Sequence, residues 1–354
     1  MRELTLTYQL FESRVNDVEL FICNMMLNNE IWSSFEELEL NKNQKHLLNY
    51  IKSSQGKTIQ YNAVIISLYG CFENYIDSIF SRYIDIVFAN THDYDSLPPK
   101  IADKYRKKIA DYLVAPHHFY GFDYSINDVI GNFHKILNSD FENSVCKKFL
   151  LMHSGNLKME QLSDFARDMG IANIKNEIFD HSLMKSFLID ALGIEESAYA
   201  VMRSNTSSDL SKYLDTLVQQ RNDVAHGWVE TNRISAYDLR NYYIPYIKVL
   251  AEVILRILLC EVYGNYLHSE DSLLFNKTPI AVYNDQILCL HINGQVILKG
   301  NYILYKSDKK INCGKIESIE INKKTVDYVN TECNVGLKLD SRIKNTDEVC
   351  AFIG

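Results

Sequence analysis

Glycine and proline are scarce in this chain, whose 354 residues include 14 glycines and 5 prolines. Both residues interrupt regular helices, glycine through its backbone freedom and proline through its missing N–H group. Their scarcity therefore favours long helices over a loop-rich fold. The eight cysteines include no Cys-x-x-C pair, so neither a zinc site nor a disulfide framework is indicated. We expect no metal and a reducing, cytoplasmic environment.

Long apolar runs of the kind that cross a membrane are also missing. The chain opens on mixed polar residues and lacks the apolar segment of a signal peptide. The most apolar stretch, residues 242–260, carries Lys248, Glu252 and Arg256 at four-residue spacing, which gives it a polar edge. We therefore expect no membrane partner.

An excess of positive charge is absent too, since the net charge is −8. This balance argues against indiscriminate coating of nucleic acid, because repulsion lowers the encounter rate. The charge is uneven, with 26 Lys and Arg against 36 Asp and Glu in residues 1–275, and 11 against 9 in residues 276–354. Any nucleic-acid site must therefore be local.

The most informative stretch is the amphipathic segment 210–230. Its apolar residues recur at three- and four-residue steps, which predicts a helix over about 209–229 with one buried face: Leu210, Tyr213, Leu214, Leu217, Val224, Ala225 and Trp228. Arg221 falls within that stripe, where a cation needs a partner or a function. Asn222 and His226 are neighbours on a second, polar face, and Gly227 follows where a helix often ends.

Residues 221–226, R-N-D-V-A-H, resemble the R-N-x-x-x-H active-site signature of the HEPN superfamily of all-helical domains, many of them RNases of toxin and antiviral systems. The following His-Gly-Trp and the run 68–77, LYGCFENYID, are similar to the RiboL-PSP branch. The resemblance implies a metal-free ribonuclease without a cofactor, which leaves 2′,3′-cyclic phosphate ends. It assigns His226 as base or acid, Arg221 as the phosphate-binding cation and Asn222 as an orienting amide, roles that suit their chemistry.

Geometry limits how these residues can act together. Arg221 and His226 are five residues apart, so on a straight helix their directions differ by about 140°. Either the helix deforms near Gly227, or two copies of the motif meet across a symmetric interface. HEPN nucleases are generally dimers, so the resemblance implies a homodimer with a composite active site.

A second long helix is predicted over residues 58–88. Its core-facing stripe would hold Ile59, Ala63, Ile66, Gly70, Phe80 and Ile84, and Glu73 and Asp77 fall on the same face. Because a buried carboxylate and a buried guanidinium each need a partner, we predict that Glu73, or failing that Asp77, reaches Arg221. The alternative is that both acids reach solvent at the edge of the stripe.

The remaining helical part is predicted to contain a last core helix over 235–266 and a helical insertion over about 97–203. The last helix is so apolar that we expect it to pack against both its own domain and a second chain. Within the insertion lies a basic run, which is either a solvated face or a contact for RNA phosphates, formed by Lys104, Arg106, Lys107 and Lys108.

Short apolar runs separated by turn signals replace the helical pattern after Lys277. They predict six or seven strands in a small closed barrel, with a hairpin at Asn293-Gly294. Residues 315–327, 334–340 and 347–349 resemble the second domain of elongation factor Tu and related translation factors. That likeness implies contact with tRNA, but the chain has no G-x-x-x-x-G-K-[ST] loop, so GTPase activity does not carry over.

The sequence therefore predicts an α+β protein with a helical HEPN-like domain over 1–275 and a translation-factor-like barrel over 276–354. The predicted function is a metal-independent endoribonuclease with a toxin or antiviral role, which cuts tRNA or translation-associated RNA. Two alternatives stay open. One is a non-catalytic HEPN module for dimerisation or RNA binding, with the barrel as recognition domain. The other is the toxin half of a pair whose antitoxin or regulatory partner controls the site.

Overall fold

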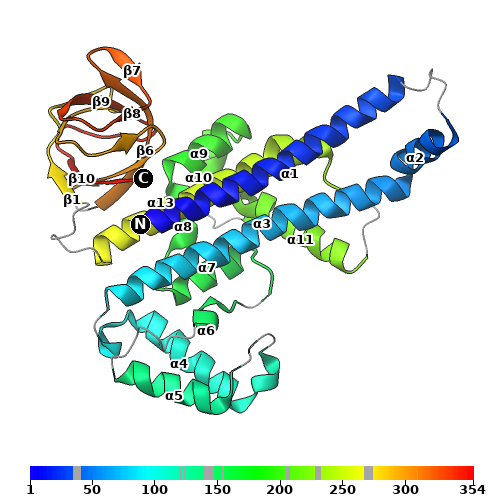
Figure 1. Cartoon of the computed structure of the whole chain (residues 1–354), viewed down its shortest axis with the longest axis horizontal. Coiled ribbons are helices and arrows are strands. Elements are labelled where there is room, and N and C mark those ends of the chain that lie inside the picture. Colours follow the sequence, from blue (N-terminus) through cyan, green and yellow to red (C-terminus); the bar gives the residue numbers. More distant parts are fainter. Residues whose placement is uncertain are drawn as a thin grey trace. The chain divides into compact units, whose positions relative to one another are not determined.

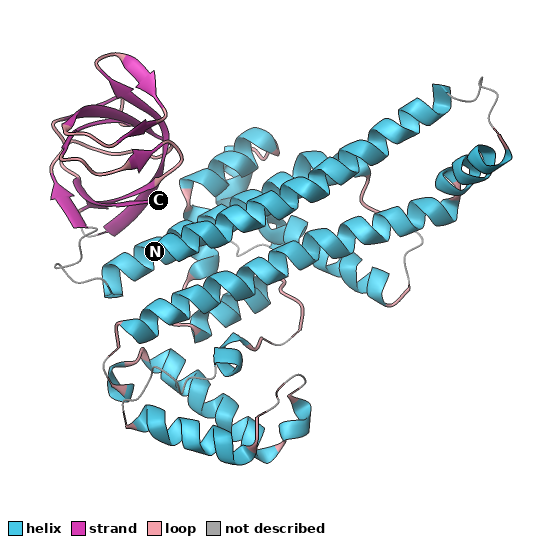
Figure 2. Cartoon of the chain, in the orientation of Figure 1, coloured by secondary structure: helices cyan, strands magenta, loops and turns pink. Residues whose placement is uncertain are grey.

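The described part of the chain is helical up to Tyr266 and forms strands from Leu274 onward (Figure 2). The computed structural model describes all residues except 35–40, 92, 120, 121, 123, 139–146, 154, 205–207, 228–232, 267–273 and 309. This combination of a helical part and an antiparallel sheet confirms the predicted α+β class.

The helices in chain order are α1 (Arg2–Ser34), α2 (Lys42–Lys52), α3 (Ser54–Ala89), α4 (Pro99–Val114), α5 (Ile126–Leu137), α6 (Lys147–Leu151), α7 (Met159–Asp168), α8 (Ile174–Asp180), α9 (Ser182–Ser186), α10 (Glu196–Ser204), α11 (Lys212–Ala225), α12 (Ala236–Asp238) and α13 (Ile244–Tyr266) (Figure 1). Short 3-10 turns occupy Tyr94–Ser96, Pro116–His118 and Ser208–Ser211. The helices predicted over 58–88, 209–229 and 235–266 thus correspond to α3, α11 and the α12–α13 region.

Side-chain caps explain where several helices begin. The α2 helix starts with a capping box between Asn41 and Gln44. Before α12, the hydroxyl of Ser235 accepts a hydrogen bond from the backbone N–H of Asp238 at 2.9 Å, as serine at an N-cap commonly does. A π-helical turn over Leu239–Tyr243 precedes Pro245, whose missing N–H interrupts the regular helical hydrogen-bond pattern.

The chain divides into two compact units. The first unit contains Met1–Leu6, Ile79–Met152 and Ile254–Gly354, and the second contains Thr7–Ser78 and His153–Val253. The predicted insertion over 97–203 is therefore shared between the units. The predicted domain boundary between residues 275 and 276 stays a prediction.

In the second unit, α1, α3 and the first part of α13 pack together through aromatic and polar contacts. The rings of Phe11 and Tyr75 lie 4.6 Å apart between their centroids, and the Tyr75 hydroxyl donates to the carbonyl oxygen of Ala251 at 2.7 Å. Lys248 Nζ lies 2.6 Å from Glu19 Oε2. These contacts fix α3 as the central helix against which α11 packs, since the hydroxyl of Tyr61 on α3 donates to Gln220 on α11.

The first unit contains α4–α6, the end of α13 and the whole sheet. Strands β1 (Leu274–Lys277), β2 (Ala281–Tyr283), β3 (Ile287–Ile292), β5 (Tyr302–Ser307), β6 (Lys310–Ile321), β7 (Lys324–Val326), β9 (Cys333–Leu339) and β10 (Glu348–Ile353) form one antiparallel sheet. Its order is β1-β10-β5-β6-β9-β3-β2, and β7 pairs with β6. Strands β4 (Ile297–Leu298) and β8 (Tyr328–Val329) form a separate pair.

The sheet curls around an apolar core as a half-barrel (Figure 1). Alternate residues of β3 face this core, namely Leu288, Leu290 and Ile292, as the two-residue period of a strand requires. In the described residues β1 and β2 are the two ends of the sheet and do not pair with each other. The expected closure of the barrel is therefore wrong.

The hairpin predicted at Asn293-Gly294 is also wrong. Strand β3 pairs with β2 and β9, whereas β4, which follows the Asn-Gly step, pairs with β8. The tight turns lie elsewhere: Asn284 and Asp285 connect β2 to β3, and Asn322 and Lys323 connect β6 to β7, all four with positive φ. Asn and Asp tolerate this conformation better than most residues, so they can replace glycine in such turns.

The apolar surface of α13 is covered within the single chain. Residues 253–259 are all buried, and Arg256 among them is 2% exposed. Its guanidinium pairs with Asp340, with 2.5 Å between Nη2 and Oδ2, and lies over the ring of Tyr302. The expectation that this stretch of α13 packs against a second chain is therefore wrong, because its own chain already surrounds it.

Candidate active site on helices α3 and α11

Helix α11 carries the predicted motif at its C-terminal end. Its apolar side is anchored in the second unit by buried Leu214, Leu217 and Val218. Arg221 and Asn222 are half-buried, and His226 is exposed. The amphipathic pattern thus places the motif where the helix leaves the core, so that its polar groups reach the surface.

The end of α11 is defined by Gly227. The backbone N–H of His226 still donates to the carbonyl oxygen of Asn222 at 3.0 Å, and Gly227 then adopts a φ of +74°. Glycine reaches this left-handed conformation without the steric cost that a Cβ atom brings. His226 therefore follows the last helical residue, Ala225. Trp228, which the pattern assigned to the apolar stripe, lies outside the described residues.

Arg221 stacks on an aromatic ring. Its Cζ atom lies 5.4 Å from the ring centroid of Tyr69 on α3, and the Tyr69 hydroxyl donates to Glu73 Oε1 at 3.0 Å. Burial raises the pKa of Tyr69, which keeps the phenol protonated and able to donate. The described residues thus connect Arg221 to Glu73 through Tyr69 and include no ion pair between the two. The predicted direct contact is corrected to an indirect one.

The reason for this correction lies in how α3 is covered. Ile59 and Ile66 are each 51% exposed, whereas Phe80 and Ile84 on the same helical face are buried. Only the second half of this face is therefore inside the protein, and the core-facing stripe predicted at Ile59, Ala63 and Ile66 is exposed. Glu73 and Asp77 lie at the transition and are half-buried, which agrees with the alternative that placed them at the edge.

Asn222 is held by a residue distant in sequence. Its Oδ1 atom accepts a hydrogen bond from Asn156 Nδ2 and lies 3.4 Å from Arg221 Nη1. With the carbonyl oxygen engaged on both sides, the amide NH₂ of Asn222 is the group turned away from these partners. An NH₂ group is the donor that a phosphate oxygen would require.

A histidine that the sequence did not single out completes the cluster. His153 Nε2 lies 3.3 Å from Asp77 Oδ1, and His153 Nδ1 lies 3.0 Å from the carbonyl oxygen of Gly155. The Asp77 carboxylate beside the ring raises the pKa of His153, although burial acts in the opposite direction. Asp77, predicted as a partner of Arg221, instead pairs with His153.

The family comparison covers most of the helical part of the chain. The model of the family described as RiboL-PSP-HEPN matches residues 30–259, more than half of the chain. The chain belongs to this HEPN family. No curated protein matches the chain. HEPN domains are often RNases, and they often dimerise and bind RNA. The matched range includes α3, α11 and the residues around His153, whereas the sheet lies outside the range.

The basic run on α4 is only partly available to RNA. Lys104 is 7% exposed, because it lies beside Ile101 and Tyr105 on the buried face of the helix, so its predicted RNA contact is wrong. Arg106 is exposed and pairs with Asp103 on the same helix. Lys107 is exposed and Lys108 is half-buried. Phosphate contact by Arg106, Lys107 and Lys108 stays a prediction.

Two properties complete the description of this HEPN protein. Among the described residues, no group of His, Cys, Asp or Glu side chains is arranged to hold a metal ion. No helix in the same residues is long and apolar enough to cross a membrane.

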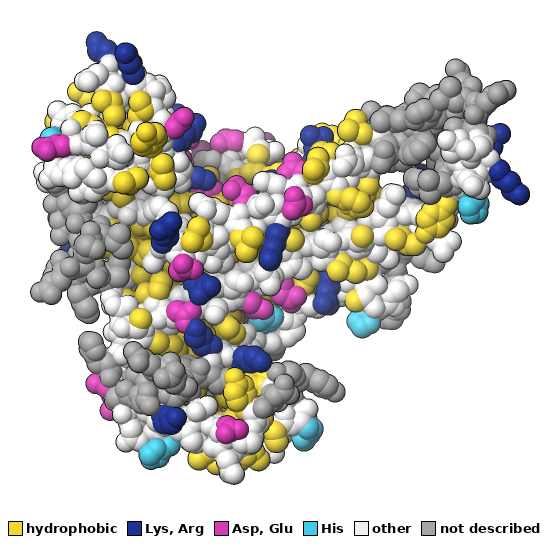
Figure 3. Space-filling view, viewed as in Figure 1, with side chains coloured by type: hydrophobic (Ala, Val, Ile, Leu, Met, Phe, Trp, Pro, Cys, Tyr) yellow, Lys and Arg dark blue, Asp and Glu magenta, His cyan; other side chains and the backbone are white. Residues whose placement is uncertain are grey.

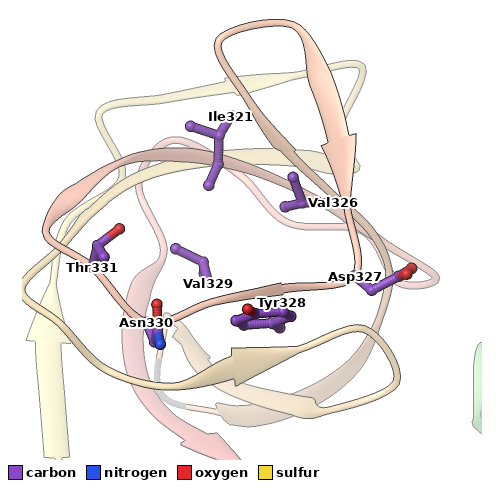
Figure 4. Close-up of a pocket in the computed structure, with 7 residues that line it drawn as sticks. All are labelled: Ile321, Val326, Asp327, Tyr328, Val329, Asn330 and Thr331. Carbon is purple, nitrogen blue, oxygen red and sulfur yellow. The ribbon is translucent and has the colours of Figure 1, made fainter.

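A pocket of about 460 Å³ lies in the half-barrel (Figure 4), and none of its lining residues is a predicted site residue. It is lined by Ile321, Val326, Asp327, Tyr328, Val329, Asn330 and Thr331. The ring of Tyr328 is 58% exposed, and its strand partner Leu298 is 45% exposed. No pattern in the sequence indicates this pocket.

Proposed function

We propose that this HEPN protein is a metal-independent endoribonuclease that leaves 2′,3′-cyclic phosphate and 5′-hydroxyl ends. The observation that carries the proposal is the arrangement at the end of α11. Arg221 is held on the Tyr69 ring, Asn222 is held by Asn156, and His226 is exposed one residue beyond the helix. Preorganised donors of this kind need no rearrangement when negative charge develops on a phosphate.

The proposed reaction is an internal transesterification. His226 accepts the proton of the 2′-hydroxyl, whose oxygen attacks the adjacent phosphorus and displaces the 5′-oxygen of the next nucleotide. Arg221 binds the phosphate oxygens through its planar fork of donors, and the NH₂ group of Asn222 donates to the same group. The 5′-oxygen leaves with a proton supplied by the protonated imidazole of a His226 side chain, since histidine can serve as acid as well as base. These roles can be filled by side chains alone.

We propose further that two copies form one composite site. Arg221 and His226 diverge by about 140° on a helix, so a second motif is the simplest source of the missing group. An exposed face for such a partner exists on α3, where exposed Ile59, Ala63 and Ile66 and half-buried Gly70 follow a four-three-four spacing. Hydrophobic side chains are visible along the first half of α3 in Figure 3. This face would replace α13 as the expected site of dimerisation.

The half-barrel and the family bear on the substrate and the biological role. The half-barrel occupies the part of the chain with more basic than acidic residues, and its sequence resembles a translation-factor domain, which favours tRNA or translation-associated RNA. The family favours a toxin or antiviral role in the cytoplasm, with an antitoxin or regulatory partner that controls the site.

Incubation of total RNA with the protein in EDTA tests the proposal. Wild type should cleave the RNA, and His226→Ala should lower the rate by about 10²- to 10⁴-fold, as expected for loss of a proton-transfer group. His134→Ala is the matched control, because His134 is an exposed histidine on α5 outside the motif. Cleavage that persists in His226→Ala, or that EDTA abolishes, contradicts the mechanism.

The pocket beside Tyr328 favours one second candidate, a non-catalytic RNA-binding module with the half-barrel as recognition domain. An exposed aromatic ring beside polar Asn330 and Thr331 could stack on a base of single-stranded RNA (Figure 4). This candidate predicts RNA binding without cleavage. It also predicts that Tyr328→Ala weakens binding while His226→Ala leaves it unchanged. Cleavage by wild type that His226→Ala abolishes excludes it.

A further inference from the structure

The segment from His153 to Leu157 connects the two helices of the proposed active site. It approaches α3 through His153 and Leu157, and it approaches α11 through Asn156. The next helix is tied to α11 as well, because the N–H of Met159 donates to Asp215 Oδ1 at 2.9 Å. Of this segment, His153 and Gly155–Leu157 are described. We refer to these four residues as the brace.

The first contact of the brace sets the orientation of Asn222. Asn156 Nδ2 donates to Asn222 Oδ1. A side-chain amide has its acceptor on one arm and its donors on the other, so engaging the oxygen turns the NH₂ group outward. Without Asn156, the Asn222 amide could rotate and present its oxygen to a phosphate, which would repel it.

The second contact fixes the ring under Arg221. The backbone N–H of Leu157 donates to the Tyr69 hydroxyl at 3.0 Å, and the same hydroxyl donates to Glu73. Both hydrogen-bonding functions of the phenol are therefore occupied. The ring cannot tilt without losing one of them, and the guanidinium of Arg221 stacks on that ring.

The third contact anchors the brace through His153. Nδ1 faces the Gly155 carbonyl oxygen and Nε2 faces the Asp77 carboxylate, so each ring nitrogen has an acceptor opposite it. Neutral imidazole has a single N–H, whereas imidazolium has two and satisfies both acceptors. The other groups that face this ring are Glu73 on α3, which also favours the charged form, and the ring of Phe165 on α7.

We propose that the brace is the positioning element of the active site, and that the charge on His153 determines how firmly it holds Arg221 and Asn222. The inference rests on the proposed nuclease function. His153 acts through its neighbours and is a positioning residue, with no proposed contact to the scissile phosphate.

The direction of the pH effect follows from the raised pKa of His153. A raised pKa means that the folded protein binds this proton more tightly than an isolated histidine does. The anchoring is therefore complete below about pH 6.5, the ordinary pKa of histidine, and is lost as the pH rises through the raised value. The rate of RNA cleavage should therefore fall on the alkaline side of its pH profile as the anchoring is lost.

Two substitutions at one position test the brace by cleavage of a labelled RNA oligonucleotide. Asn156→Ala frees the Asn222 amide to rotate and should lower kcat by about 10- to 100-fold, with little change in KM. Asn156→Asp should lower it further, because a carboxylate only accepts and would draw the Asn222 NH₂ group towards itself. The matched control is Asn176→Asp, at an exposed residue of α8. Equal kcat values for wild type and both Asn156 variants overturn the proposal.

A double-mutant cycle in urea unfolding, with Asn156→Ala and Asn222→Ala singly and together, separates this inference from the proposed function. Coupling between the two positions together with an inactive wild type would support the contact and reject the nuclease function. Additive effects of the two substitutions on unfolding would reject the contact itself, whatever the activity.

The pH profile of kcat tests the anchor. Deprotonation of the leaving-group imidazolium should lower the activity of every variant on the alkaline side, and in wild type the loss of the His153 charge should add to this limb. His153→Gln, which cannot become charged, should lack that added loss, so that its alkaline limb differs from that of wild type. Asp77→Asn should move the limb to lower pH, because the carboxylate is the main cause of the raised pKa. An alkaline limb that is identical in wild type and in both variants overturns the regulatory part of the proposal.

Discussion

At the residue scale, the distinctive feature is a guanidinium held without a direct carboxylate partner in the described residues. Arg221 stacks on Tyr69, and the negative charge of Glu73 acts through the phenol. A close ion pair with a carboxylate would occupy the N–H donors of the Arg221 guanidinium. Stacking instead fixes the plane of the guanidinium and, apart from Nη1, which donates to Asn222 Oδ1, leaves its N–H groups available to a phosphate.

Substitution of Arg221 by lysine tests the importance of this geometry. Lysine keeps the positive charge but has neither the planar fork nor the stacking surface. Arg221→Lys should lower kcat/KM for RNA by about 100-fold, in the range for loss of a preorganised charge-stabilising group. The free energy of unfolding should fall by only about 0.5–1 kcal/mol from the lost stacking.

The control for this variant is Arg203→Lys, which alters a surface ion pair with Asp180. Steady-state kinetics and urea unfolding of both variants decide the outcome. Full activity of Arg221→Lys would mean that charge alone suffices, and the argument from the fork and the ring would be wrong.

The sequence predicts some residues of the site and misses others for a clear reason. Arg221, Asn222 and His226 form a local pattern, and Gly227 is a local stop signal. Asn156 lies 66 residues and Tyr69 lies 152 residues from the motif residue that each contacts. No periodicity in the sequence indicates these contacts or the pairing of His153 with Asp77. Tyr69 had one available signal, its position one helical turn before Glu73 on the same helix.

At the element scale, the central observation is that α3 is covered along only part of its length. The spacing of Ile59, Ala63 and Ile66 correctly indicates an apolar stripe, but periodicity cannot say what covers it. Isolated exposed apolar residues are ordinary, whereas a stripe at heptad-like spacing is typical of a helix-to-helix contact.

Ile66→Asp tests whether this stripe binds a second copy. Because Ile66 is 51% exposed, its replacement should change the free energy of unfolding of a single chain by no more than about 0.5 kcal/mol. Self-association should weaken strongly, since a carboxylate would be buried at the interface. Sedimentation at several protein concentrations measures the effect.

Ser67→Asp adds the same charge at the next, exposed position, which lies off the stripe, and should leave association unchanged. If Ile66→Asp associates as wild type does, the stripe is not the dimer contact. If wild type itself is monomeric at all concentrations and cleaves RNA, the composite site is wrong.

Element boundaries were more predictable than element pairing. Caps such as Ser235 and breaks such as Gly227 are encoded by neighbouring residues, so the ends of α12 and α11 could be read from local sequence. Strand pairing depends on residues far apart. The Asn293-Gly294 step has the composition of a hairpin turn, yet the strand after it pairs with β8.

At the scale of the whole molecule, one buried ion pair links helix and sheet within the first unit. Arg256 on α13 is 2% exposed, and Asp340, which follows β9, accepts from Arg256 and from the backbone N–H of Lys315. The Asp340 carboxylate thus neutralises the buried guanidinium on α13 and also accepts a hydrogen bond from the backbone of β6. The sequence shows a polar edge on α13 that includes Arg256, but it does not show that Arg256 pairs with Asp340.

Asp340→Asn should destabilise this unit by about 3–5 kcal/mol, because it leaves the buried Arg256 without its countercharge. Asp164→Asn is the control, since its pair with Arg167 is exposed and should contribute less than about 1 kcal/mol. Urea unfolding followed by circular dichroism measures both. Equal stability of the two variants would contradict the role given to the buried pair.

The chemistry of the RNA ends tests the central claim most directly. Wild-type protein is incubated with a defined RNA in EDTA, and the fragments are offered to a polynucleotide kinase without prior phosphatase treatment. A proton taken by His226 and a phosphate held by Arg221 and Asn222 predict 5′-hydroxyl ends that accept label directly, and 2′,3′-cyclic phosphates on the upstream fragments. Fragments with 5′-phosphate and 3′-hydroxyl ends, or cleavage that requires a divalent metal, would contradict the account.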